Sequence, residues 1–308
     1  MRKLRVGAIS RNYFNLPLWI ALQEGFFARE GLAVEIELHE PIDEVTRRLH
    51  EGHFQFALEV TENAILNRER GGRLCVLGGN INRLPFSFMA RPQIRGWQDM
   101  RGARIGVSSL AAGSSSLVMK LMEAHGLHHP QDYTLLPVGP ILARWEMLQK
   151  GEIDAGLQGA PLNHIARDLG YTDLGDPRQT FPDFQFTSLD ADSAWVRDNE
   201  ATVLAFLRAW IGAHRWFHAN PEGSAAIAMR ETGVARRYAD LAWQEFTRDA
   251  IFPRDGRASP AGVQTLIETS AQIRALALRS SARASDYIEQ RHLDAAERSL
   301  GAAGDGPR

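Results

Sequence analysis

Residues 17–38 read PLWIALQEGFFAREGLAVEIEL, a helix-like segment followed by a strand-like one. Leu18, Leu22 and Phe26 recur at three- to four-residue spacing, which predicts one buried face of a helix over residues 17–30. Gly31 is suited to end this helix in left-handed geometry. Because a short apolar strand precedes the stretch, at residues 4–9, the stretch is the αβ half of a strand–helix–strand unit.

The same landmarks recur 99 residues further along the chain. RVGAIS at 5–10 is echoed by RIGVSS at 104–109, and LHEGHFQFAL at 49–58 is echoed by LQKGEIDAGL at 148–157. A solenoid repeat would have a period of roughly 20–50 residues. The longer period indicates two related α/β units, in which alternating strands and helices predict parallel sheets with covered faces.

The remaining pattern predicts how the two units are joined. Strands near 86–91 and 184–189 connect them, which gives a discontinuous lobe I (1–88 plus 190–308) and a lobe II (89–189). After about residue 190 the pattern becomes helical. The predicted helices cover residues 198–219, 222–232, 235–248 and 259–278.

Composition excludes several classes of protein. The 308 residues include 35 Lys and Arg and 37 Asp and Glu, so the net charge of −2 gives no footprint for nucleic acid. One cysteine, Cys75, rules out an internal disulfide and any Cys-rich metal site, and its apolar neighbours predict a thiol in a buried strand. HEGH at 50–53 and HGLHH at 125–129 lack the spacing of zinc enzymes. We therefore expect no metal, no cofactor and no catalytic group.

The N-terminal stretch MRKLRVGAIS lacks the roughly 7–15 apolar residues of a secretory signal. No apolar stretch of about 18 residues follows that could insert into a membrane. The expectation is a chain that is either cytoplasmic or supplied without its leader, in which case it would belong to the periplasm or cell envelope.

Open parallel sheets bind ligands beyond the carboxyl ends of their strands, so two facing units would share one ligand cleft. The loops at those ends supply the predicted ligand-binding residues. These are Ser10, Arg11, Asn12 and Tyr13 after the first strand; Glu59, Thr61 and Asn80 further along the first unit; and Ser108, Ser109, Gly113, Ser114, Ser115, Gln158 and Gly159 in the second.

Three of these predictions leave alternatives open. The serines of AAGSSS, residues 111–116, suit either an anion site at a helix N-terminus or simple helix capping. Arg11 and Arg83 could each supply a positive charge at the mouth of the cleft or be solvated. Glu59, at a predicted strand end, could accept a hydrogen bond from a ligand or form a salt bridge with Arg11 or a nearby lysine or arginine.

The segments LPLWIALQEGFFAREGLAVEIEL (16–38), GHFQFALEVTENAI (52–65), GARIGVSS (102–109) and LQKGEIDAGLQGAPL (148–162) are similar to landmarks of the SsuA/THI5-like (NMT1-type) substrate-binding proteins. Gln55 departs from that pattern, where many relatives carry aspartate. The resemblance implies a type II periplasmic-binding-protein fold, in which two α/β lobes close on a small molecule.

The function that the resemblance implies is that of a solute-binding protein of an ABC importer. Its ligand would be a small anionic or zwitterionic molecule of the sulfonate, nitrate or thiamine-pyrimidine type, and its partner a permease/ATPase complex. Nothing in the sequence demands more than a monomer. The alternative is a cytoplasmic decarboxylase, lyase or thiamine-pyrimidine-related enzyme on the same scaffold, using Arg11, Glu59 or His53.

Overall fold

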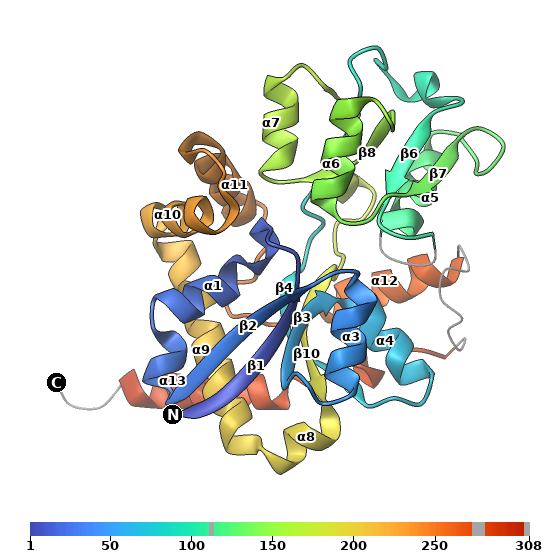
Figure 1. Ribbon diagram of the computed structural model, residues 1–308. Coiled ribbons are helices and arrows are strands. Elements are labelled where there is room, and N and C mark those ends of the chain that lie inside the picture. Colours follow the sequence, from blue (N-terminus) through green and yellow to red (C-terminus); the bar gives the residue numbers. More distant parts are fainter. Residues whose placement is uncertain (111–113, 273–280, 305–308) are drawn as a thin grey trace.

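The computed structural model describes residues 1–110, 114–272 and 281–304 and contains two five-stranded sheets (Figure 1). Sheet 1 has the order β2 (Leu32–His39), β1 (Arg2–Ile9), β3 (Phe56–Val60), β10 (Thr187–Asp192) and β4 (Leu74–Ile81). Sheet 2 has the order β7 (Thr134–Pro137), β6 (Arg104–Val107), β8 (Ala155–Gly159), β5 (Phe86–Ala90) and β9 (Thr172–Asp173).

The predicted repeat is present in space. β1 and β6 occupy the same position in the two sheets, as do β3 and β8. β3 begins at Phe56 and β8 at Ala155, 99 residues apart, and the helices before them, α3 (Ile42–His50) and α6 (Ile141–Lys150), begin with the same offset. The helices that follow β3 and β8 are α4 (Thr61–Glu69) and α7 (Leu162–Asp168). The spacing in the sequence therefore predicts the architecture correctly.

The expectation of purely parallel sheets is wrong for one strand position in each sheet. β10 is antiparallel to β3 and β4, and β5 is antiparallel to β8 and β9. Each is the first strand after the chain crosses from the other sheet. β5 begins with Phe86 opposite Gly159, and β10 begins with Thr187 opposite Val60, so both crossings enter at a carboxyl end. The carboxyl ends of β3 and β8 therefore lie on the sides of the two sheets that the crossing segments join.

The predicted continuous helix over 17–30 is interrupted. α1 (Leu16–Gln23) ends before Gly25, whose φ of 73° is left-handed, and a one-turn helix α2 (Phe26–Arg29) follows. Glycine adopts this conformation without the Cβ clash that other residues have, so the chain turns here. As a result Leu22 is exposed rather than part of the buried face.

The remaining helices surround the sheets. They are α5 (Ser114–Ala124), α8 (Ser193–Asp198), α9 (Glu200–Ala219), α10 (Pro221–Thr232), α11 (Arg236–Arg248), α12 (Pro260–Gln272) and α13 (Arg291–Gly304). The helix predicted over 198–219 is thus preceded by a separate short α8. α9 packs beside α1 and α13, while α11 reaches α7 on the other sheet (Figure 1).

Strand membership also bears on the predicted division into lobes. The boundary after residue 88 falls inside β5, and the boundary before residue 190 falls inside β10. The division into lobe I and lobe II stays a prediction.

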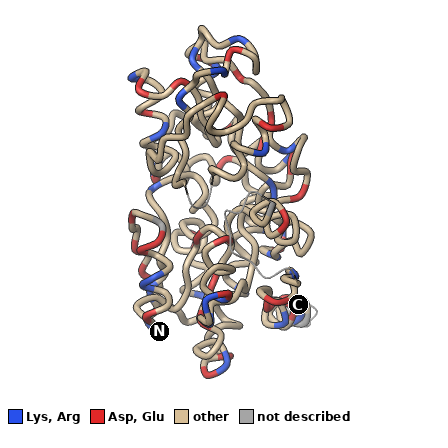
Figure 2. The backbone as a smooth tube through the Cα atoms, turned by 90° about the vertical axis from the view of Figure 1, so that its right-hand side faces the viewer, with Lys and Arg blue, Asp and Glu red and all other residues tan. Residues whose placement is uncertain are grey.

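Basic and acidic side chains are interspersed over the part of the chain that the structure describes (Figure 2). Many of them are paired, as in the exposed ion pair of Arg236 with Glu222. Within the described ranges, no helix is both long and apolar enough to cross a bilayer.

Candidate functional site

The two sheets meet at Phe14 and Gly159. Phe14 follows β1, and Gly159 ends β8. A Cβ atom at residue 159 would lie 2.8 Å from Phe14 Cζ and 2.9 Å from Ile141 Cδ1, so only glycine leaves room for the ring. This contact brings the carboxyl end of a strand in one sheet against the loop that follows a strand in the other.

Aromatic rings line the two chain crossings beside this contact. The centroid of the Phe14 ring lies 6.0 Å from that of Phe86 and 6.2 Å from that of Phe186, and the last two are 5.0 Å apart, all edge to face. Phe86 and Phe186 each stand at the end of a crossing segment. The trio therefore gives the junction between the sheets an apolar centre.

Polar side chains of sheet 1 surround that centre. Asn80 donates through Nδ2 to the Phe14 carbonyl at 2.9 Å and to Thr187 Oγ1 at 3.0 Å, while its Oδ1 is buried without a partner. Thr61 begins α4, and its buried Oγ1 also has no partner.

Tyr13 is 1% exposed and packs against Phe246 and Phe252. Its hydroxyl has no partner, and burial raises the pKa of that hydroxyl.

Gln158 supplies the corresponding polar group of sheet 2. It is fully buried, and neither its Nε2 nor its Oε1 has a partner. It pairs across the sheet with Ser87, whose hydroxyl accepts from Asn163 at 3.3 Å and Arg167 at 2.6 Å. A buried polar atom without a partner costs about 1–3 kcal/mol, so such atoms at one junction mark where a bound molecule would supply the missing bonds.

Glu59 is the penultimate residue of β3, its side chain lies between β3 and α3, and its Oε1 is buried without a partner. It is fully buried, and Thr46 donates to its Oε2. Asp190, on the same face of the sheet, is its acidic neighbour. Burial raises the pKa of Glu59 to about 8, and burial together with the Glu59 charge raises the pKa of Asp190. The pair thus keeps a proton at neutral pH, and the predicted salt bridge with Arg11 does not form.

The loop after β1 organises itself. Asn12 accepts from the Phe14 amide at 2.9 Å and donates to Ser10 Oγ at 3.2 Å. Arg11 pairs with Glu231 of α10 and lies over the Trp19 ring. The charge of Arg11 is therefore already paired with a carboxylate of α10.

The serine stretch is used at least partly for capping. The Ser108 amide donates to Ser114 Oγ at 2.9 Å, and the Ser114 amide donates to Ser108 Oγ at 3.1 Å, a reciprocal pair at the start of α5. Ser115 is buried and Ser109 is half-buried. Gly113 lies outside the described residues.

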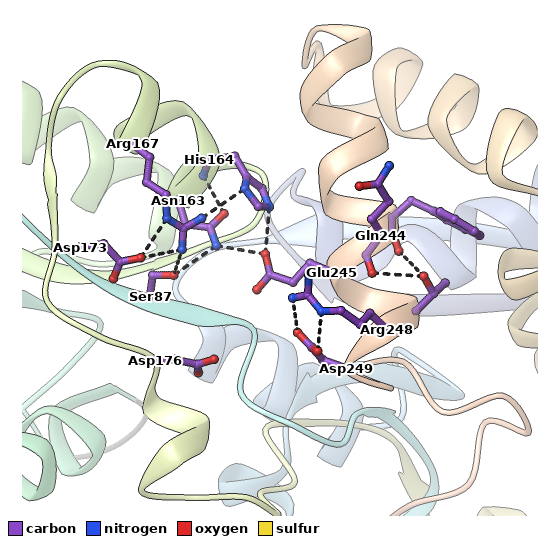
Figure 3. Close-up of polar contacts among 12 residues, drawn as sticks. Ser87, Asn163, His164, Arg167, Asp173, Asp176, Gln244, Glu245, Arg248 and Asp249 are labelled. Atoms are coloured by element: carbon purple, nitrogen blue, oxygen red, sulfur yellow. Dashed lines mark hydrogen bonds and ion pairs between the residues drawn. The ribbon is translucent and has the colours of Figure 1, made fainter.

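A second polar contact joins the two sheets' helices, between α7 and α11 (Figure 3). Glu245 of α11 is 4% exposed, accepts from Asn163 Nδ2 at 3.1 Å and from Arg178 at 3.2 Å, and lies 2.9 Å from His164 Nε2 in an ion-pair contact. Burial alone would raise the pKa of Glu245, but the bond from His164 and the charge of Arg178 outweigh it, so the pKa is lowered.

The sequence patterns single out neither Glu245 nor Arg144. Glu245 lies on a helix remote in sequence from both repeats, and its partners become apparent only in the folded chain. Arg144 is 3% exposed in the first turn of α6, although arginine is rarely buried. The apolar residues around it, as in ILARWEML at 141–148, were the available signal.

The candidate enzymatic groups are not brought together. Cys75 lies in β4, 1% exposed, and burial raises the pKa of its thiol, so it is not poised as a nucleophile. His53 is 53% exposed and lies near Glu51 after α3. Arg11 and Glu59 have the separate partners described above. Among the described residues, no group of three or more His, Cys, Asp or Glu could hold a metal ion.

Comparison with known proteins gives relatives of modest identity. The chain is 24% identical over 221 residues to a formylaminopyrimidine-binding protein of Halalkalibacterium halodurans, a match that covers 69% of this chain and 65% of the relative. It is 25% identical over 182 residues to a 4-amino-5-hydroxymethyl-2-methylpyrimidine phosphate synthase of Schizosaccharomyces pombe, covering 58% and 49%. The matches thus span less than two thirds of either relative.

Solved structures show the same fold at lower identity. The nitrate-binding protein NrtA of Synechocystis PCC 6803 superposes with a TM-score of 0.81 at 14% identity, covering 100% of this chain and 90% of that one. The alkanesulfonate-binding protein SsuA of Xanthomonas axonopodis pv. citri gives 0.74 at 14% identity, covering 94% and 99%. The type II periplasmic-binding-protein fold expected from the sequence is confirmed.

The model of the family described as NMT1/THI5 like matches residues 13–224. This range includes β10 and the repeated landmarks at 49–58, 104–109 and 148–157, and it amounts to more than half of the 308 residues. The chain belongs to the NMT1/THI5-like family.

Proposed function

We propose that this protein is the solute-binding component of an ABC importer and that it holds a small molecule between the carboxyl ends of its two sheets. The observation that carries the proposal is the set of unpartnered, buried polar atoms on Asn80, Thr61 and Gln158, which belong to both sheets. A ligand at the junction would satisfy them. The binding proteins for nitrate, alkanesulfonate and formylaminopyrimidine among the similar proteins support this reading.

Closure would follow a hinge motion of lobe I against lobe II. The chain crosses between the sheets only through the segments after β4 and before β10, within the residues that the structure describes. A ligand that contacts both lobes binds the closed form better than the open form and shifts the population toward it. The closed form would then be presented to a permease/ATPase complex outside the cytoplasmic membrane.

The polar groups at the junction suit a protein that binds its ligand without converting it chemically. Asn80, Thr61 and Gln158 are neutral donors and acceptors, which bind well but do not exchange protons near neutral pH. The similar pyrimidine phosphate synthase keeps an enzyme as the second hypothesis. It predicts that the ligand is converted, and it needs a catalytic group other than Cys75 or His53.

The test is calorimetric titration with a panel of sulfonates, nitrate and aminopyrimidines, with recovery of the ligand afterwards. Thr61→Val removes an unpartnered hydroxyl while keeping its shape, so we expect at least tenfold weaker binding and an unchanged fold. Thr232→Val is the matched control, because that hydroxyl bonds to Ala228 O at 2.7 Å at the end of α10. Wild-type binding of no panel member, or recovery of an altered molecule, would count against the proposal.

A further inference from the structure

Arg144 is a buried cation without a counterion. Its side chain is 3% exposed, and it forms no ion pair with any carboxylate of the described residues. NH1 donates to the Leu157 carbonyl at 2.5 Å, and Nε is buried without a partner. Charged groups are almost never buried unless they are paired, because removing a charge from water costs several kcal/mol.

Sheet 2 is shaped to hold this arginine. A Cβ at Gly106 would lie 3.1 Å from Arg144 Cγ, and one at Gly156 would lie 2.8 Å from Arg144 Cδ. These two glycines are partners in the register of β6 with β8. The absence of side chains at both positions leaves a groove along the sheet in which the arginine stem lies.

The groove leads toward the junction between the sheets. Residues two apart in a strand share a face, so Gln158 lies on the same face of β8 as Gly156 and one step nearer its carboxyl end. Ile141, one turn before Arg144 in α6, contacts the position of Gly159, where Phe14 of the other sheet also lies. The bond from Arg144 NH1 to the Leu157 carbonyl places the guanidinium beside the residue that precedes Gln158, near the end of sheet 2 that contacts Phe14.

We propose that Arg144 and Gln158 together bind the oxyanion head group of the ligand, a sulfonate, carboxylate or nitrate. This inference rests on the proposed function and selects the anionic class among the ligands that the similar proteins bind. The guanidinium supplies N–H donors and a full charge in a site shielded from water, where such bonds are about twice as strong as neutral ones. The Gln158 Nε2 adds a neutral donor. Burial lowers the pKa of Arg144 to about 10, which still leaves it charged at neutral pH.

The alternative cation, Arg11, does not serve this role. It is paired with Glu231 and is more than half exposed. Arg167 pairs with Asp173 at 2.7 Å, and Arg104 pairs with Asp154 at 2.9 Å. These neighbouring arginines of sheet 2 already have carboxylate partners, whereas Arg144 has only a carbonyl.

The experiment compares ethanesulfonate and nitrate with the neutral ethanesulfonamide, by calorimetry and thermal shift on the full chain. We expect wild type to bind one or both anions and to bind the sulfonamide much more weakly. Arg144→Met keeps the stem over Gly106 and Gly156 but removes the charge, and it should weaken anion binding about 10- to 100-fold. The melting temperature without ligand should be retained or rise, since an unpaired buried charge is lost.

Arg104→Gln is the matched control, an arginine of the same sheet whose loss should leave anion affinity unchanged. Arg144→Lys, which keeps both charge and stem, provides a second variant if the methionine variant does not fold, and it too should bind the anion more weakly. Anion affinity that is equal in wild type and both variants would overturn the inference. Tight wild-type binding of a neutral pyrimidine, unaffected by Arg144→Met, would overturn it while leaving the proposed function intact.

Discussion

The ring of Phe14 occupies the space that a side chain at Gly159 would need, with Phe14 Cζ 2.8 Å from the position of the absent Cβ. Phe14 follows β1 of the first sheet and Gly159 is the last residue of β8 in the second, so each lies at the carboxyl end of a strand. The contact is therefore a point at which the two units close on each other. Adding a single methyl group at residue 159 therefore tests whether this contact limits closure.

Gly159→Ala should hinder closure. The added methyl group would collide with Phe14 and Ile141, and the φ of Gly159 does not itself require glycine. We expect ligand affinity to fall at least tenfold while secondary structure is retained, as measured by titration and circular dichroism. Gly96→Ala is the control, since no atom lies within 4 Å of a Cβ there. Equal affinity for both variants would show that the Phe14 contact does not limit closure.

Glu245→Gln should destabilise the protein. The carboxylate is only 4% exposed and contacts Asn163, His164 and Arg178. A neutral glutamine would leave His164 and Arg178 without their carboxylate partner. The expected loss is about 2 kcal/mol of unfolding free energy, measured by urea denaturation. Glu222→Gln breaks an exposed ion pair with Arg236 instead and should change the free energy by less than about 0.5 kcal/mol.

Glu59→Gln should change how stability depends on pH. The ordinary glutamate pKa of 4.5 is raised to about 8 in the folded protein, so over that interval the folded chain keeps a proton that the unfolded chain has released. Unfolding free energy therefore falls as pH rises from about 4.5 to about 8, and the variant should show a shallower fall. Denaturation at several pH values tests this. Glu123→Gln, at an exposed site, should follow wild type.

Tyr13→Phe should stabilise the ligand-free protein. The hydroxyl is buried without a partner among Phe246 and Phe252, so removing it relieves a desolvation penalty and should add about 1 kcal/mol of unfolding free energy. A lower melting temperature in the variant would instead indicate that the hydroxyl has a partner in solution.

Ser114→Ala should weaken the start of α5. The variant loses the bond from the Ser108 amide to Ser114 Oγ at 2.9 Å, which costs about 1 kcal/mol, and keeps the bond from the Ser114 amide to Ser108 Oγ at 3.1 Å. The melting temperature should fall in Ser114→Ala and remain at the wild-type value in Ser299→Ala, whose hydroxyl bonds within α13. If both variants melted as wild type does, the reciprocal pair would have no capping role.

The sequence predicts the arrangement of strands and helices in this protein better than it predicts the contacts of the binding site. The 99-residue offset reveals both units, because each apolar strand and each terminal glycine must recur for the unit to be built twice. Gly31 has the left-handed φ that the pattern predicts for the end of its helix, and Gly52, Gly126 and Gly151 also have a left-handed φ. Such local requirements can be read along one strand or helix.

The direction in which a side chain points depends on partners that are distant in the sequence. Arg11 pairs with Glu231, 220 residues away, and Glu59 contacts Thr46 and Asp190. The burial of Arg144 depends on two glycines in different strands. The positions of the strand ends in the sequence predict where the site lies. Packing between the two units decides which residues at those strand ends face the site.

The central claim is that a small molecule is held between the two sheets and released unchanged. Native mass spectrometry of the purified full chain, after incubation with the sulfonate, nitrate and aminopyrimidine panel, tests it most directly. The account predicts one noncovalent ligand per chain, lost on unfolding with its mass unaltered and bound less by Thr61→Val and Gly159→Ala. A covalent adduct, a released molecule of different mass, or occupancy unaffected by both variants would contradict it.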